Sequence, residues 1–197
     1  MSYHVYTAKG IILRERPLKE ADLSLKILTR ELGLITAIAT GLRKGNSKRR
    51  PPLTELSLSD VSLVRGKRDW RVTSASLEIN AYNALKNNRK ILLSVARALF
   101  LVENLVQGEE KHPELFNTLY EFITFGFTEN LSGLEEIFES ILVARILSKL
   151  GYLSEKEFPE IIFNDEVTKE LFEKNITLNK SLILAINKGI RESGLIK

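Results

Sequence analysis

The chain has 197 residues, of which 44% are hydrophobic and 27% are charged, proportions that are usual for a soluble globular protein. Its apolar stretches, such as Ile141 to Leu147, fall well short of the ~20 residues that a membrane span needs. The N-terminal segment carries no apolar signal core, so we expect a cytoplasmic protein without a membrane partner. Cysteine is absent and only His4 and His112 are present, which excludes disulfides, thiolate metal sites and multi-histidine metal sites.

Charge is distributed unevenly between the two halves of the chain. Residues 1–80 hold 15 Lys and Arg against 8 Asp and Glu, a net charge of +7. Residues 81–197 hold 14 against 17, a net charge of −3. This asymmetry predicts that the first half faces a polyanion and that the second half has a different role.

The first half has the pattern of short strands. Apolar and polar residues alternate with period two, as in Leu23, Leu25 and Ile27, and hairpin-sized connections separate the stretches. We expect five strands, over residues 4–15, 23–28, 34–40, 56–64 and 70–79. Closure into a small antiparallel barrel removes exposed strand edges, and five strands on this scale point to an OB-fold.

From about residue 81 the apolar spacing becomes helical. The stretch Ile91–Val106 is apolar nearly all round and predicts a buried central helix. Ser132 followed by Glu135 is a capping-box pattern. We expect helices over 91–106, from 113 onward, from 132 to 151, over 166–174 and over 179–190, with a loop over 152–165. The fold class is therefore α+β, all-β and then all-α, with an OB-fold domain over 1–79 and an α-helical domain over 80–197.

Two basic clusters lie in the first half. The segment Gly41–Pro52 (GLRKGNSKRRPP) has five Lys or Arg within eight residues, a pattern that suits phosphate. The segment Arg65–Arg71 (RGKRDWR) contains Trp70, the only tryptophan, which could stack a base or fill the barrel core. Each cluster could also be an ordinary solvated surface. Further charge along the first two strands comes from Arg14, Arg16, Lys26 and Arg30.

No catalytic constellation is found. The segment GLRKGNSK lacks the glycine spacing and the Lys-Ser/Thr pair of a phosphate loop. There is no G-x-S-x-G or H-E-x-x-H motif, and Glu109 and Glu110 are expected to be solvated. We therefore predict a protein that is not an enzyme and that has no cofactor and no metal.

The run from Thr7 to Lys44 strongly resembles the N-terminal domain of the RecO family of bacterial recombination mediators. Four family patterns occur in order: GIILRERP, KEAD, LTRELGL and GLRK. Further on, Trp70–Leu77 and the Leu150–Tyr152 helix end resemble family segments. The chain departs from many members after residue 153, because the segment SEKEFPEIIFND has no cysteine and so lacks their zinc module.

The resemblance implies a function in recombinational DNA repair. Family members bind single- and double-stranded DNA, anneal complementary strands and help to load RecA onto DNA coated by single-strand binding protein. The implied partners are RecR, in some bacteria RecF, and the acidic C-terminal tail of single-strand binding protein, which the helical domain contacts. The implied location is the nucleoid in the cytoplasm.

The residues and the resemblance together give a set of candidate site residues. For DNA phosphates and bases we predict Arg14, Arg43, Lys44, Lys48, Arg49, Arg50, Lys67, Arg68, Trp70 and Arg71. If about five phosphates of a single strand are engaged, log affinity should fall against log salt with a slope near −3.5, at ~0.7 per contact. For the acidic tail we predict Arg97, Arg145 and Lys149. The alternatives are an RNA-binding OB module and a protein adaptor that binds acidic proteins; a nuclease ranks below both.

Overall fold

The computed structural model of this chain describes residues 4–18, 20–42, 51–67, 69–164 and 166–194. It divides into two compact units. The barrel unit comprises residues 1–84 and 107–116, and the helical unit comprises residues 85–106 and 117–197. The domain boundary predicted after residue 79 remains a prediction. In the structure, the barrel unit also includes residues 80–84 and the short connector 107–116.

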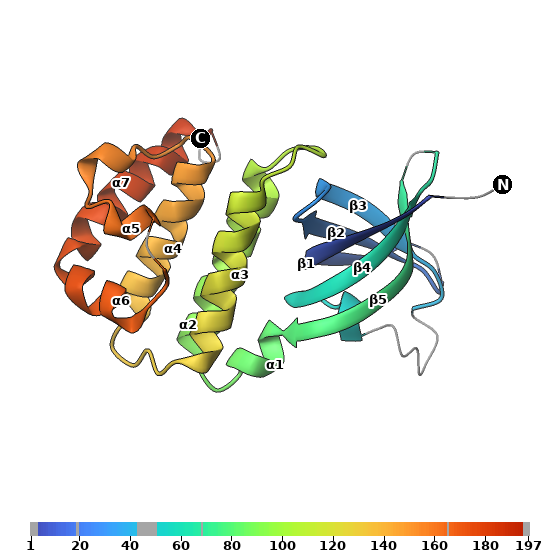
Figure 1. Ribbon diagram of the computed structural model, residues 1–197, viewed down its shortest axis with the longest axis horizontal. Helices are drawn as coiled ribbons and strands as arrows, with labels where there is room; N and C mark the ends of the chain where they lie inside the picture. The colour runs from blue at the N-terminus through green and yellow to red at the C-terminus, as the bar shows by residue number, and fades with distance from the viewer. Residues whose placement is uncertain (1–3, 19, 43–50, 68, 165, 195–197) are drawn as a thin grey trace. The chain divides into compact units, whose positions relative to one another are not determined.

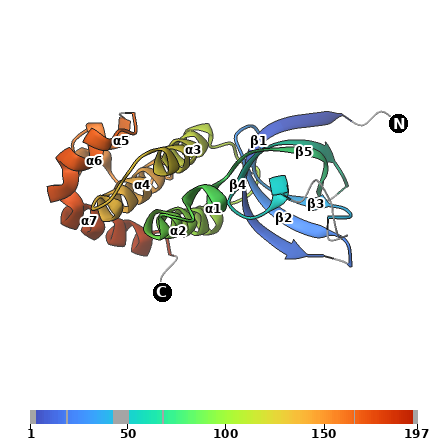
Figure 2. The ribbon, with the colours of Figure 1, turned by 90° about the horizontal axis from the view of Figure 1, so that it is seen from below.

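The barrel unit contains the five strands expected from the sequence (Figure 1). They form a closed barrel in the order β1-β2-β3-β5-β4, and in Figure 2 they curve around a common ring. All neighbours are antiparallel except β3 and β5, which are parallel and pair over two residues only. The bounds are β1 (Val5–Pro17), β2 (Leu23–Thr29), β3 (Gly33–Ala39), β4 (Ser57–Arg65) and β5 (Trp70–Asn80), with a 3₁₀ turn η1 (Pro51–Leu53) before β4. The predicted OB-fold is confirmed.

Strand β1 is long because it pairs with two neighbours. Its first half pairs with β4 and its second half with β2, and at Gly10 and Ile11 it pairs with both. A Cβ atom at residue 10 would lie 2.8 Å from Cγ2 of Ile27, which is too close. Gly10 therefore lets β1 bend tightly between its two partners, as glycines in barrel strands often do.

The barrel interior is filled by aliphatic side chains and one tryptophan. Leu25 and Ile27 of β2, Ala37 of β3 and Val61 of β4 are fully buried, and Trp70 of β5 is 5% exposed. Leu42 and Leu53, which lie just beyond β3 and within η1, belong to the same core. The chain is thus fixed to the barrel both before and after residues 43–50.

The helical unit is built around a cluster of phenylalanines. The ring centroids of Phe122 and Phe138 lie 5.2 Å apart, and those of Phe138 and Phe172 lie 5.5 Å apart. All three side chains are almost fully buried. The helices are α1 (Ala81–Leu85), α2 (Arg89–Leu105), α3 (Pro113–Thr128), α4 (Glu135–Lys149), α5 (Ile161–Asn164), α6 (Lys169–Asn175) and α7 (Asn179–Glu192), with 3₁₀ turns η2 (Glu155–Glu157) and η3 (Ile176–Leu178).

Three expectations about the helices are wrong. Ser132 does not cap α4, because residues 131–134 form a separate turn in which the Leu134 N–H donates to the Leu131 carbonyl, and α4 begins after Leu134. The helix α2 is not buried all round, since Leu93 and Phe100 are exposed. The stretch 152–165 is not a plain loop, because it contains η2 and α5.

Candidate nucleic-acid interface

Strand register brings four basic residues onto one outer face of the barrel. Arg14 of β1 lies opposite Lys26 of β2, which lies opposite Thr36 of β3. In the next row Arg16 lies opposite Ser24, Ser24 opposite Ile38, and Ile38 opposite Arg71 of β5. Side chains of cross-strand partners emerge on the same face of a sheet. We call this surface the basic strand face; its cations are Arg14, Arg16, Lys26 and Arg71.

The burial pattern confirms which way these side chains point. On β2 the residues flanking Lys26, namely Leu25 and Ile27, are fully buried in the barrel, whereas Lys26 is partly exposed. On β5 Arg71 is exposed between buried Trp70 and Val72. Arg16 is also exposed. With strands about 4.8 Å apart, the row from β1 to β5 spans roughly 14 Å. Neither row, in the strands described, contains an acidic side chain, so the face is suited to an extended anion.

The β4–β5 hairpin adds charge beside this face. Its turn closes through a hydrogen bond from the Gly66 N–H to the Asp69 carbonyl, at 2.9 Å. A Cβ atom at residue 66 would lie only 2.6 Å from that carbonyl oxygen, so this tight turn requires glycine. Lys67 is exposed at the tip. Of the predicted hairpin residues, Lys67 and Arg71 are therefore solvent-accessible, and Arg68 lies outside the described residues.

The predicted basic loop cannot be placed in the same way. Arg43, Lys44, Lys48, Arg49 and Arg50 lie outside the described residues. Gly41, just before them, donates its N–H to the Asp22 carboxylate at 3.1 Å, which ties the end of β3 to the β1–β2 connection. The end of β3, just before this segment, thus lies at the same end of the barrel as the start of β2.

Trp70 occupies the barrel core and does not present its ring to solvent. Its ring meets that of Tyr6 edge-on at 5.1 Å between centroids, and the Arg65 guanidinium lies 4.7 Å from the ring centroid. The indole N–H donates to the Glu109 carboxylate at 3.1 Å. Of the two interpretations of Trp70, the structure supports the core residue, because no face of the ring is left open for a base.

The three residues predicted to contact a partner have different environments in the helical unit. Arg97 of α2 donates to both carboxylate oxygens of Glu139 of α4, at 2.7 and 2.5 Å. These hydrogen bonds, together with the carboxylate charge, raise the pKa of Arg97. Arg145 is 3% exposed and donates to the Ile162 carbonyl at 2.5 Å. Lys149 is partly exposed in the last turn of α4. The structure does not bring these three side chains together into a basic rim.

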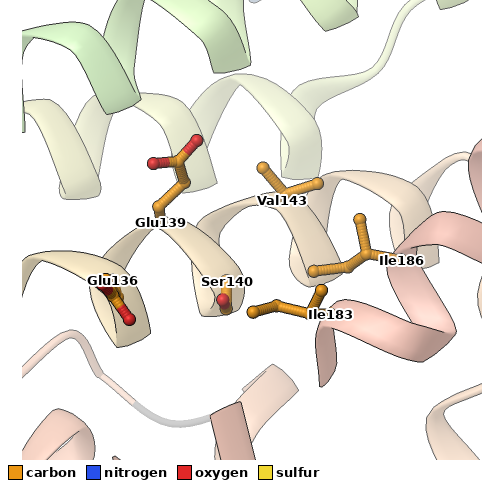
Figure 3. A pocket seen from close by; sticks show the side chains of 6 residues that line it. All are labelled: Glu136, Glu139, Ser140, Val143, Ile183 and Ile186. Carbon is orange, nitrogen blue, oxygen red and sulfur yellow. The ribbon is translucent and has the colours of Figure 1, made fainter. Parts of the chain in front are cut away.

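A pocket of about 240 Å³ lies in the helical unit, between α4 and α7. Figure 3 shows Ile183 and Ile186 of α7 pointing towards α4, and Val143 completes the apolar lining. The polar lining is Ser140, Glu136 and Glu139; Arg97 neutralises Glu139, and Glu136 leaves the charge at this pocket negative. That sign is opposite to the one an acidic tail would require.

Sequence reasoning missed one residue of the barrel surface. Glu109 was expected to be solvated, but its carboxylate accepts hydrogen bonds from both Arg65, at 2.5 Å, and Trp70. Glu109 is 44 positions from Arg65, and no local pattern links the two. In the described residues, no group of three or more His, Cys, Asp or Glu side chains could hold a metal ion. None of the described helices is long and apolar enough to cross a bilayer.

Comparison with known proteins shows similarity to one family, both for the barrel and for most of the chain. Residues 1–78 match the family model described as "Recombination protein O N terminal". The chain is 33% identical over 123 residues to the DNA repair protein RecO of Gloeobacter violaceus, which covers 62% of this chain and 45% of that protein. It is 34% identical over 145 residues to the RecO of Alkaliphilus metalliredigens (73% and 56%), and 32% identical over 158 residues to that of Heliobacterium modesticaldum (77% and 53%).

The chain spans about half the length of these curated relatives. The match to the family model covers the OB-fold barrel. The relatives, all named DNA repair protein RecO, match about three quarters of this chain. The barrel topology agrees with the fold expected from the motifs between Thr7 and Lys44. Barrel, family model and relatives together identify residues 1–78 as a RecO N-terminal domain, in a chain that is similar to RecO proteins beyond it.

Proposed function

We propose that this chain binds DNA through its barrel, as a non-catalytic component of recombinational DNA repair. The observation that carries the proposal is the basic strand face, in which Arg16 and Arg71 end a single cross-strand row. OB-folds bind oligonucleotides on the face of strands 2 and 3 and on the neighbouring loops. Lys26 lies on β2, and Arg14, Arg16 and Arg71 lie on β1 and β5, the strands that flank β2 and β3. The name of the relatives, DNA repair protein RecO, supports the same function.

The chemistry of the face favours phosphate over base recognition. Arg and Lys side chains neutralise backbone phosphates and release counterions, which gives affinity without reading sequence. The buried ring of Trp70 removes the one tryptophan that could stack a base. We therefore expect single and double strands both to bind, with strong salt dependence and little preference for sequence. The predicted loop residues between Arg43 and Arg50 are part of this proposal and extend the contacts.

The experiment that tests the proposal compares two double variants with the same loss of charge. Arg16→Ala/Arg71→Ala removes two cations from the basic strand face. Lys180→Ala/Lys188→Ala removes two exposed cations from α7 and serves as the control. Affinity for a fluorescein-labelled single-stranded oligonucleotide is measured by anisotropy over a salt series. With ~0.7 per contact, the slope of log affinity against log salt should become shallower by about 1.4 in the face variant only. Equal effects of the two variants would overturn the assignment of the face.

We further propose that the protein speeds annealing of complementary strands and, with RecR or RecF, helps to load RecA. Neutralised phosphates let two strands approach each other, so annealing needs no nucleotide. The test uses two labelled complementary oligonucleotides with the wild type and a variant in which Arg43, Lys44, Lys48, Arg49 and Arg50 are changed to alanine. Faster annealing by the wild type alone would support this role; equal rates would remove it.

The contact with the acidic tail of single-strand binding protein is proposed for the helical unit without a defined pocket. Arg145 is buried and so cannot contact the tail, and Arg97 is already paired with Glu139. Lys149 remains of the three residues predicted from the sequence. The α4–α7 pocket is not part of this proposal, because its carboxylates would repel an acidic tail.

A further inference from the structure

Arg65 is held by a carboxylate that belongs to a distant segment of the barrel unit. Nη1 of Arg65 donates to Oε1 of Glu109 at 2.5 Å, and the same oxygen accepts the indole N–H of Trp70. The Arg65 and Glu109 side chains are both 46% exposed, so water and solutes reach the pair. A half-exposed ion pair of this kind contributes little to stability and is screened by salt. The pair can therefore be broken by a competing anion.

The connector that carries Glu109 is fixed to the barrel without this ion pair. The Leu34 N–H donates to the Gly108 carbonyl at 3.2 Å. Gly33 has φ +73°, and a Cβ atom there would lie 2.3 Å from the Glu110 carbonyl oxygen. The backbone of residues 108–110 thus lies directly against the start of β3. Loss of the Glu109 charge would leave the connector in place.

Arg65 lies at the same end of β4 as Lys67, a cation already assigned to the interface. Its own cross-strand partner is the core residue Trp70, whereas its neighbour Val64 pairs with Arg71, so Arg65 lies at the hairpin end of the barrel and not within the basic strand face. The exposed Lys67 follows two residues later, and a phosphate that reached the Arg65 guanidinium would extend the interface to this end of the barrel. Carboxylate and phosphate oxygens both fit the planar guanidinium fork, so one can replace the other.

We propose that Arg65 is a further phosphate ligand of the barrel, and that Glu109 occupies its guanidinium until DNA displaces the carboxylate. This inference rests on the proposed DNA binding. Glu109 acts as an internal competitor: it lowers affinity for single strands and stays oriented by Trp70 when Arg65 turns to the phosphate. In the wild type, the charge of the Glu109 carboxylate that DNA displaces offsets the counterion released by the Arg65–phosphate contact, so removal of that charge should raise the salt dependence by the equivalent of one phosphate contact.

The test uses Glu109→Gln, in which the amide oxygen still accepts the Trp70 N–H while the charge is lost. Glu110→Gln is the matched control, because it makes the same charge change one residue away and Glu110 has no contact with Arg65 among the described side chains. Arg65→Ala and Arg65→Ala/Glu109→Gln complete the cycle. Affinity of the full chain for a labelled oligo-dT is measured over a tenfold range of salt.

The proposal predicts that Glu109→Gln binds more tightly than Glu110→Gln at low salt. At ~0.7 per contact, its affinity should fall about five-fold more than that of the wild type over the tenfold salt range. The gain should vanish when Arg65 is alanine. Equal behaviour of the two glutamine variants, or a gain that survives in Arg65→Ala/Glu109→Gln, would overturn the proposal while DNA binding by the wild type stands. Absence of binding by every variant would instead overturn the proposed function and, with it, this inference.

A second measurement needs no variant at Glu109. Trp70 is the only tryptophan in the chain, and the Arg65 guanidinium lies over its ring. If DNA draws Arg65 away, the fluorescence of Trp70 should change on titration of the wild type with oligo-dT. The same titration of Arg65→Ala should give no change although DNA still binds. Identical responses of the two proteins would contradict displacement.

Discussion

The basic side chains of the two units are used in different ways. In the helical unit, Arg97 pairs with Glu139, Lys90 lies 3.8 Å from Glu135, and Arg145 is buried against a backbone carbonyl. On the basic strand face of the barrel, Arg16 and Arg71 have no ion pair within the described residues. The comparison teaches that burial and strand register, more than the number of cations, decide which of them can meet an anion.

Two faces of the barrel also differ in whether their cations are paired with carboxylates. On β1, Lys9 contacts Glu78 of β5 at 2.7 Å and Asp60 of β4 at 3.8 Å, so the β1–β4–β5 side is internally neutralised. In the two described rows that cross β1, β2, β3 and β5, every charged side chain is a cation. A polyanion therefore has one favourable face on the strands of this barrel.

The largest effect is expected from Trp70→Ala, which tests whether Trp70 belongs to the core. Loss of a buried aromatic side chain should lower the free energy of unfolding by about 3–5 kcal/mol, measured by denaturant titration. Trp70→Phe should cost less, because one aromatic ring is kept, although part of the buried indole volume and the hydrogen bond to Glu109 are lost. DNA affinity of the folded Trp70→Phe protein should remain close to that of the wild type. A large loss of affinity at unchanged stability would restore the stacking role.

The next effect concerns Arg145, which the comparison treats as structural. Arg145→Met keeps the aliphatic volume but leaves the Ile162 carbonyl without this donor. Hydrogen bonds to charged groups are worth about 1.5–3 kcal/mol, so thermal or denaturant unfolding should show a loss of that order. Binding of a peptide with the acidic tail sequence of single-strand binding protein should be unaffected. Weaker peptide binding by a variant of normal stability would contradict the structural role.

A smaller effect is expected at the Arg97–Glu139 pair. Arg97→Ala should lower the free energy of unfolding by at most about 1 kcal/mol, because the Arg97 side chain is 60% exposed and surface ion pairs contribute little. Affinity for DNA should not change. A drop in DNA affinity comparable with that of Arg16→Ala/Arg71→Ala would show that helical-unit cations also hold DNA.

The smallest effect should come from the Glu170–Lys174 pair on α6. The hydrogen bond and the charge of Lys174 lower the pKa of Glu170. Its stabilising contribution is therefore present above the ordinary Glu pKa and is lost as pH falls through the lowered value. Glu170→Gln should be slightly less stable than the wild type near about pH 7 and equal to it near about pH 3. A difference that grew on acidification would contradict this sign.

The strands could be predicted from the sequence because each carries its own signal. Alternation in Leu23, Leu25 and Ile27 marks a strand with one buried face, and the other strands follow from full or partial alternation or, over residues 34–40, from an apolar and β-branched run. The start of α4 could not be predicted, because the turn at residues 131–134 competes with the capping-box pattern at Ser132. Local patterns do not reveal which of two good local options the tertiary structure selects.

The interface divides in the same way. Arg71 was predicted from a basic cluster and Arg14 from the charge along the first two strands, and the register places them in adjacent rows of one face. The ion pair of Arg65 with Glu109 depends on a contact across 44 residues, and a single sequence carries no signal for it. Whether Trp70 is buried or exposed could not be predicted for the same reason, because Glu109 accepts the hydrogen bond of the buried indole N–H.

The central claim is that the barrel holds DNA through its phosphates, and the salt dependence of single-strand affinity tests it most directly. The wild-type chain is titrated with labelled oligo-dT at a series of salt concentrations. With about five phosphates engaged at ~0.7 each, the account predicts a slope of log affinity against log salt near −3.5, reduced by about 1.4 in Arg16→Ala/Arg71→Ala. An affinity independent of salt, or an unchanged slope in that variant, would contradict it.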